Sequence, residues 1–311
     1  MTLRDTPMLA HFDSLYDLTA AFPDEQACLD HIRQIRWRDG EYCPHCGGTR
    51  IYHFSDKRNF KCGDCRQRSS IKVGTIFQDS KLPLRKWFMA IWMISNHPKG
   101  IASTTLAKDL KITQKTAWFV LHRIRHAART RSFNMPLKGT VEIDDTYVGG
   151  KAENRHGRKH GKGKSAYGHT PVIGAVERNG DAVARVVATG IGRPDAQRFI
   201  DDAVSPDADM LVTDAHPAYR AIDGFPQHQI INHHDGEYVR GNVHTQTIES
   251  VWALLKRQII GIHHWVSEKH LQRYVSEMTW RFSRRDMSVT PRMNDLFTAI
   301  DGHLSYKALT A

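Results

Sequence analysis

The sequence lacks a hydrophobic run long enough to cross a membrane. Its longest uncharged apolar stretch is residues 87–94, whereas a spanning helix needs about 20 apolar residues. The first twenty residues contain Arg4, Asp5, Asp13 and Asp17 and no continuous apolar core, so no secretory signal is predicted. These absences argue against a membrane partner and predict a globular protein of the cytoplasm.

Acidic residues are scarce in the first part of the chain. Residues 1–135 contain 22 lysines and arginines but 12 aspartates and glutamates, a balance of +10. Residues 136–311 contain 22 and 21, a balance of +1. Clustered cations bind phosphates and release counterions. The asymmetry therefore predicts a nucleic-acid-binding front part joined to a nearly neutral second part, with a solvated basic surface as the alternative.

Cysteine is also rare, and four of the five cysteines fall in two short motifs. Cys43 and Cys46 form one C-x2-C motif, Cys62 and Cys65 form the other, and 15 residues separate them. This spacing lets two turns present four thiolates to one tetrahedral Zn²⁺. Disulfides are disfavoured in a reducing compartment, and a redox C-x-x-C pair needs a thioredoxin-like context that is missing here. We predict a zinc ribbon over residues 41–78 with one structural zinc.

Helical patterns follow the ribbon. Residues 84–96 form an apolar helix, and two further helical segments predict a helix-turn-helix region over residues 79–135. Thr113 is expected to cap the last helix. The first residues of a recognition helix reach base edges. The outer face of this helix is predicted to present the candidate DNA-binding residues Gln114, Lys115 and Arg125, together with His122. A plain three-helix packing module is the alternative.

After Pro136 the hydrophobic period changes to that of strands. Residues 140–148 alternate, so Glu142 and Asp144 share one face, and two acids on one strand face invite a metal ion. Residues 171–178 and 182–190 are joined by Asn-Gly-Asp, a strong hairpin signal. The pattern predicts a sheet domain over residues 136–285.

Three acids lie on separate predicted elements. Asp144 is on the first strand, Asp214 ends a short buried strand, and Glu249 lies at the edge of the apolar face of a helix over residues 247–259. Singly, each has an ordinary interpretation as a turn residue, a strand-end cap or a first-turn helix acid. Their order along the chain is that of RNase H-like nucleic-acid enzymes, whose carboxylates hold two divalent ions. The expected fold class is therefore α/β, with an RNase H-like mixed-sheet catalytic domain.

Six stretches of the chain resemble one protein family. They are VGTIF (73–77), EIDDTYVGG (142–150), VTD (212–214), NVHTQTIESVW (242–252), KHLQRY (269–274) and RFSRR (281–285). On these motifs, the chain resembles the insertion-sequence DDE transposases with an N-terminal zinc ribbon, a group related to Merlin elements. The resemblance covers most of residues 25–285 and implies that Asp144, Asp214 and Glu249 form the catalytic triad. The family more often has Glu where Asp145 stands, but strand alternation turns Asp145 to the opposite face and favours Asp144 as the ligand.

The resemblance also implies an activity. Water would cleave DNA at the ends of a mobile element, and the freed 3′-hydroxyl would attack target DNA, with two Mg²⁺ or Mn²⁺ ions bound by the triad. Joining two ends requires a homodimer or a larger assembly on DNA, located on the nucleoid in the cytoplasm. The competing interpretations are a zinc-ribbon, helix-turn-helix DNA-binding regulator and an RNase H-like structure-selective nuclease.

Further basic residues are candidate contacts to the DNA backbone. Residues 151–169 hold six lysines or arginines, one glutamate and four glycines, too polar a composition to join a core. Candidate DNA-binding residues here and on the later helix are Lys159, Lys162, Lys164 and Lys256. The remaining segments are interpreted as a helical lead-in over residues 1–40 and a C-terminal tail over residues 286–311.

Overall fold

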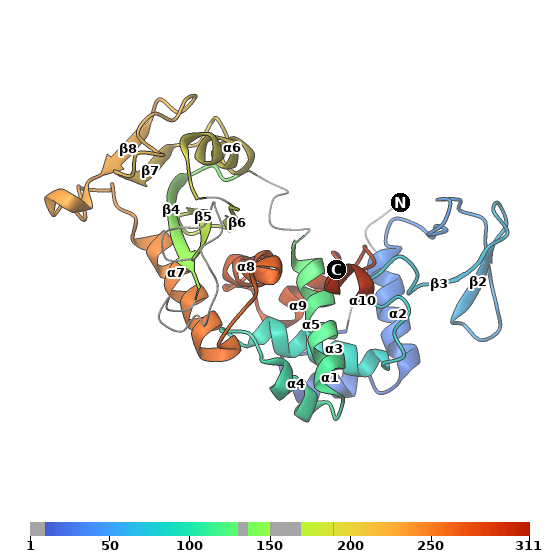
Figure 1. The fold of residues 1–311 in the computed structure, drawn as a ribbon. Helices are drawn as coiled ribbons and strands as arrows, with labels where there is room; N and C mark the ends of the chain where they lie inside the picture. Colours follow the sequence, from blue (N-terminus) through green and yellow to red (C-terminus); the bar gives the residue numbers. More distant parts are fainter. Residues whose placement is uncertain (1–9, 130–135, 150–168, 189) are drawn as a thin grey trace. The chain divides into compact units, whose positions relative to one another are not determined.

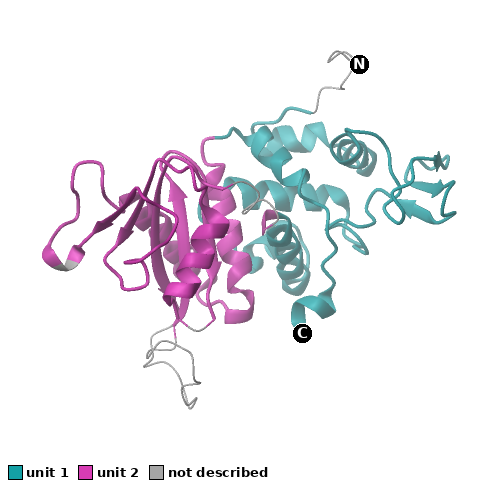
Figure 2. Ribbon diagram, turned by 90° about the horizontal axis from the view of Figure 1, so that it is seen from above, with its two compact units in different colours: residues 1–127, 287–311 teal, residues 128–286 magenta. Residues whose placement is uncertain are grey.

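The computed structural model describes residues 10–129, 136–149, 169–188 and 190–311. The chain divides into two compact units, which Figure 2 colours separately: residues 1–127 with 287–311, and residues 128–286. In the described part of the chain, no helix is both long and apolar enough to cross a membrane. The predicted DNA contacts Lys159, Lys162 and Lys164 lie outside the described residues.

The first unit combines a small antiparallel sheet with helices. Its strands pair in the order β1-β2-β3. Its elements are α1 (Leu15–Ala21), α2 (Glu25–Arg36), β1 (Ile51–His53), β2 (Asn59–Cys62), β3 (Arg68–Ser70), α3 (Leu84–Asn96), α4 (Ser103–Asp109), α5 (Gln114–Arg129), α9 (Val289–Phe297) and α10 (Tyr306–Thr310). The hydroxyl of Thr113 accepts the N–H of Thr116 at 3.1 Å, which confirms the predicted cap of α5.

The last residues of the chain belong to this first unit. The hydroxyl of Thr290 accepts the N–H of Phe12 at 2.8 Å and donates to its carbonyl. The carbonyl of Ile300 accepts the N–H of Ile76 at 2.8 Å. The sequence interpretation set residues 286–311 apart as a tail. The structure corrects this, because α9 and α10 pack with residues up to 278 positions earlier in the chain, which no local pattern reveals.

The second unit contains a mixed five-stranded sheet. The strand order is β6-β5-β4-β7-β8, antiparallel from β4 to β6 and parallel from β4 to β8. Its elements are β4 (Thr140–Val148), β5 (Thr170–Glu177), β6 (Ala182–Val186), α6 (Arg193–Ala203), β7 (Met210–Asp214), β8 (His228–Ile231), the 3₁₀ turn η2 (His233–Asp235), α7 (Gln246–Gln258), the π-helical turn η3 (Ile259–His263) and α8 (Glu268–Ser283). The predicted RNase H-like mixed sheet is confirmed.

Helices cover both faces of this sheet (Figure 1). Val141 and Ile143 of the central strand β4 pack with Phe199 of α6 in one core. On the other face, Val172 of β5 packs in a second core with residues of α7 and α8. Because side chains alternate along a strand, the even-numbered residues of β4 face α7. The pleat thus turns two acids of β4 toward this helix.

Candidate metal centres and catalytic face

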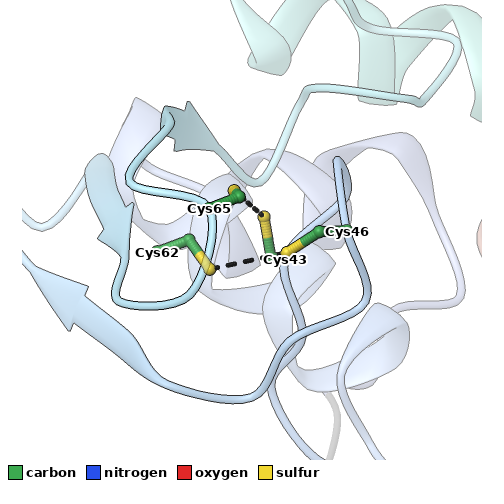
Figure 3. Close-up of side chains that lie close together, drawn as sticks. All are labelled: Cys43, Cys46, Cys62 and Cys65. Atoms are coloured by element: carbon green, nitrogen blue, oxygen red, sulfur yellow. Dashed lines mark hydrogen bonds between the residues drawn. The ribbon is translucent and has the colours of Figure 1, made fainter.

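The four cysteines of the two C-x2-C motifs converge on one point (Figure 3). Their sulfur atoms all lie within 4.8 Å of one another. The Sγ atoms of Cys43 and Cys65 are 3.7 Å apart, and so are those of Cys46 and Cys62. Thiolates bound to one zinc at about 2.3 Å lie about 3.8 Å apart at the corners of a tetrahedron. The predicted four-cysteine cluster is confirmed, and its geometry fits one structural zinc ion.

Local backbone geometry shapes the second turn of the zinc site. Cys62 ends β2 opposite Ile51 of β1. The N–H groups of Cys65 and Asp64 lower the pKa of the Cys62 thiol to about 7, because they hydrogen-bond its sulfur. A zinc ligand must be the thiolate, so these N–H groups favour the form that binds metal.

The helix-turn-helix face differs in part from its prediction. Gln114 and Lys115 are exposed at the start of α5, and the Lys115 ammonium lies 4.8 Å from the centre of the Tyr306 ring. Arg125 and His122 were predicted on the outer face, but they are buried, with 1% and 0% of their surface exposed. Helical periodicity assigned polar residues to the outside, whereas this side of α5 is buried in the folded chain. The prediction that Arg125 is an exposed DNA contact is therefore wrong, because the residue is buried.

Asp144 and Asp214 lie side by side on neighbouring strands. β4 and β7 pair in parallel with Ile143 opposite Thr213, so the register brings the next two residues level. Adjacent strands are about 4.8 Å apart, and residues in register on parallel strands share a face. The N–H of His216 donates to Oδ1 of Asp214 at 3.0 Å. Two acids from separate predicted strands thus lie level on one face of the sheet, and the charge of Asp214 acts on the Asp144 carboxyl.

The environment of Asp144 disfavours its charge. Burial raises the pKa of the Asp144 carboxyl to about 7, and the negative charges of Asp145 and Asp214 act in the same direction. The indole N–H of Trp252 on α7 donates to Oδ2 of Asp144 at 3.1 Å, which favours the ionised form. Trp252 was not singled out from the sequence, where it read as a core residue of the helix.

Asp145 occupies the opposite face, as strand alternation predicts. Its Oδ1 accepts the hydroxyl of Tyr219 at 3.0 Å, and Tyr219 belongs to the core on the α6 side of the sheet. Burial raises the pKa of Asp145, which the hydrogen bond from Tyr219 partly offsets. The structure thus separates the two adjacent acids into different surroundings.

Glu249 is exposed in the first turn of α7. Its Oε1 accepts the hydroxyl of Thr245 at 3.3 Å, and Thr245 is also 3.3 Å from Nε2 of His233. Within the described residues, the compact cluster of ligand side chains is that of the four cysteines, and the three acids do not gather as closely. Lys256 is exposed in the last turn of the same helix.

Glu142 has a different environment from the one predicted. Its side chain is fully buried, and its carboxylate binds Arg178 and the N–H groups at the start of α7. The sequence interpretation grouped Glu142 with Asp144 as a pair that invites a metal. That grouping is corrected, because protein donors already surround the Glu142 carboxylate.

Comparison with known proteins identifies the parts of the chain. Residues 136–283 match the family model of the ISXO2-like transposase domain, and residues 23–68 match that of the transposase zinc-ribbon domain. A curated relative is an uncharacterized protein in transposable element ISH50 of Halobacterium salinarum. It is 30% identical over 270 residues, which cover 82% of this chain and 89% of that protein.

One solved structure also shows a distant similarity. The crystal structure of a pre-cleavage Mos1 transpososome aligns over 70% of this chain and 80% of that chain, at 9% identity and a TM-score of 0.21, too low to support an inference. The two family matches coincide with the four-cysteine site and with the mixed sheet. The chain therefore belongs to the insertion-sequence DDE transposases with an N-terminal zinc ribbon.

Proposed function

We propose that the mixed-sheet unit cleaves DNA at the ends of an insertion sequence and transfers the freed 3′-hydroxyl ends to target DNA. Asp144, Asp214 and Glu249 would supply the carboxylates for catalytic metal ions. The observation that carries the proposal is the register of β4 and β7, which sets Asp144 beside Asp214 on the face covered by the helix of Glu249.

The residues present fit a divalent cation. Carboxylate oxygens are the ligands that Mg²⁺ and Mn²⁺ prefer. Burial and neighbouring negative charge raise the pKa of Asp144, and a cation beside it would favour its ionised form. Two such ions, when bound, activate the attacking oxygen and stabilise the leaving oxygen of an in-line displacement. The candidate ligands are the three carboxylates named above.

The chain's own groups orient two of these carboxylates. The indole of Trp252 donates to Asp144, and the N–H of His216 donates to Asp214. Both donors are neutral, so they fix a carboxylate without cancelling the charge that a metal ion requires. Trp252 also lies in the core, at 4% exposure, so its indole cannot swing away without opening that core.

DNA recognition is proposed for the first unit. The zinc ribbon and the exposed Gln114 and Lys115 at the start of α5 would bind the element ends. Lys256 and the basic segment with Lys159, Lys162 and Lys164 would contact the DNA backbone without regard to sequence. Joining two ends requires two active sites, so a homodimer or a larger assembly on the nucleoid is expected.

The test is an assay of nicking and strand joining on a labelled duplex taken from the ends of the element. Asp144→Ala, Asp214→Ala and Glu249→Ala should each abolish cleavage while end binding, measured by gel shift, stays intact. Asp145→Ala should have a milder effect. Asp202→Ala is the matched control, because this exposed acid lies on α6, over the other face of the sheet. Mg²⁺ and Mn²⁺ should both support turnover, and Ca²⁺ should support binding alone.

Three outcomes would count against the proposal. Undiminished cleavage by Glu249→Ala would remove the triad assignment. Sequence-specific binding by the wild type with no cleavage in either metal would favour a DNA-binding regulator. Cleavage that is never followed by strand joining would favour a structure-selective nuclease.

A further inference from the structure

The start of α7 is held by a buried carboxylate of β4. The side chain of Glu142 has 0% of its surface exposed. Its Oε2 accepts the N–H groups of Thr247 at 2.7 Å and Ile248 at 3.1 Å. Its Oε1 accepts the hydroxyl of Thr247 at 2.9 Å and the Nε–H of Arg178 at 2.6 Å. Four donors, from α7 and from the turn after β5, therefore converge on one carboxylate.

This carboxylate provides the cap that α7 lacks locally. The first N–H groups of a helix have no partner within the helix, and the N-cap residue usually supplies one from its side chain. The N-cap of α7 is Thr245, whose side chain makes no capping hydrogen bond. Glu142 supplies the acceptor from a strand about 100 residues earlier, and its charge also suits the positive end of the helix dipole.

Arg178 extends the same network to the segment that leads into α7. Its Nη1 donates to the carbonyl of Asn242 at 2.7 Å, and its Nη2 donates to the carbonyl of His244 at 3.0 Å. Arg178 follows β5 in the hairpin turn, where Asn179 has a φ of 59°. The guanidinium thus binds Glu142 and the lead-in segment together from a tight turn.

A second contact fixes α7 farther along its length. Trp252 binds Asp144, two residues beyond Glu142 on the same strand. Two residues of strand advance about 6.7 Å, and four to five residues of helix advance about 6 to 7.5 Å. The two contacts therefore have the same spacing along the strand as along the helix, as expected when α7 runs alongside β4, which Figure 1 shows. Glu249 lies between them in the sequence of α7.

We infer that Glu142 is a positioning residue that sets the place and rotation of the first turn of α7, and so determines where the Glu249 carboxylate lies relative to Asp144 and Asp214. The inference rests on the proposed function, because Glu249 matters here as a metal ligand. Ile248, whose N–H binds Glu142, immediately precedes Glu249, so a shift of this turn moves the Glu249 carboxylate directly. A displacement of about 1 Å is enough to cost about a hundredfold in rate at a catalytic site.

The test compares Glu142→Gln with a matched variant in the zinc-loaded full chain. Glutamine keeps the shape but loses the charge and turns an amide donor toward Arg178. Glu277→Gln is the control, because Glu277 is also a buried acid paired with an arginine, Arg281, and it contacts α7 at its other end through Gln258. Mn²⁺ binding is measured from the electron paramagnetic resonance signal of free Mn²⁺, and amide hydrogen exchange is followed at the start of α7.

Glu142→Gln should weaken Mn²⁺ binding about tenfold and speed exchange of the Thr247 and Ile248 amides, with DNA-end binding unchanged. Glu277→Gln should lower stability without changing Mn²⁺ affinity. Thr247→Val removes one donor to Glu142 and keeps the backbone N–H. It should weaken Mn²⁺ binding in the same direction by a smaller factor, and it carries the test if Glu142→Gln does not fold.

Wild-type Mn²⁺ affinity in folded Glu142→Gln, or in Thr247→Val where Glu142→Gln is unfolded, would overturn the inference. An equal loss of affinity in Glu277→Gln would also overturn it, because general loosening of the unit would then explain the effect. These failures differ from failure of the proposed function. If the proposed function fails, the wild type itself would show no cleavage and no Mn²⁺ binding that depends on Glu249.

Discussion

Alanine at Gly174 is expected to displace the indole that orients Asp144. Gly174 of β5 lies opposite Asp144 of β4 in the sheet. A Cβ at this position would lie 2.4 Å from Cη2 and 2.8 Å from Cζ2 of Trp252. Carbon atoms in favourable contact are about 3.5 to 4.0 Å apart, so the overlap is about 1 Å. Because Trp252 is buried, either the ring or the strand must shift.

The expected loss of stability in Gly174→Ala combines two destabilising effects and one stabilising effect. Overpacking of a filled core costs about 1 to 3 kcal/mol. A displaced indole also loses its hydrogen bond to the Asp144 carboxyl, which contributes about 0.5 to 1.5 kcal/mol when the carboxyl is neutral and about 1.5 to 3 kcal/mol when it is ionised. Replacing glycine with alanine stiffens the unfolded chain, which returns about 0.4 to 1 kcal/mol. We therefore expect Gly174→Ala to lower the free energy of unfolding by about 2 to 4 kcal/mol.

A double-mutant cycle with Trp252→Phe isolates this contact. Phenylalanine lacks the two indole atoms that meet the new methyl group, so Gly174→Ala should cost less than about 1 kcal/mol in that background. Urea unfolding in saturating zinc measures the four free energies. Gly261→Ala is the control, because a Cβ there meets no atom within 4 Å, and it should change stability by less than about 0.5 kcal/mol. Equal costs of Gly174→Ala in both backgrounds would refute the reasoning.

Three further predictions concern zinc, pH and the C-terminal segment. Purified protein should contain one Zn²⁺ per chain, and Cys62→Ser should release it and unfold the ribbon, as metal analysis and circular dichroism would show; metal-free protein with disulfides would contradict this. Burial lowers the pKa of His31 to about 4, so between pH 6.5 and 4 the unfolded chain binds a proton that the folded chain does not. Stability should therefore fall by up to about 3 kcal/mol as pH drops through this window, and His31→Gln should lose this part of the dependence in urea unfolding at each pH. Arg123→Met should cost about 3 kcal/mol and expose residues after Leu304 to limited proteolysis, because buried Arg123 donates to the carbonyls of Ile76 and Leu304; unchanged resistance would refute this.

Periodicity predicted the long elements closely. The apolar run over residues 84–96 is α3, Leu84–Asn96, and the alternating run over residues 140–148 is β4, Thr140–Val148. Both patterns are local, since the spacing of apolar residues along one element determines which face it can bury. The four-cysteine cluster could also be predicted, because two C-x2-C motifs determine its four ligands and depend little on the rest of the fold.

Features that depend on distant contacts were not predicted. β8 (His228–Ile231) is an edge strand of four residues, too short for a clear alternation, and its pairing with β7 defines it. α9 joins the first unit through contacts such as that of Asn294 with His31, 263 positions earlier. The buried Arg125 shows the same limit, because a helical pattern assigns a charged residue to solvent unless its surroundings are known.

The three acids of β4 show where local reasoning separates residues and where it does not. Alternation distinguishes Asp145, which binds Tyr219, from Glu142 and Asp144, but those two share a face and the same period. Their difference comes from other elements. Glu142 is level with Val212 of β7, and its carboxylate accepts the N–H groups that begin α7. Asp144 is two residues farther along β4, where the register makes it level with Asp214, the last residue of β7. The Glu142 carboxylate caps the start of α7, whereas the Asp144 carboxylate lies beside that of Asp214. The register of β7 and the axial position of α7 therefore determine which acid caps the helix and which lies beside Asp214, where we propose a metal site.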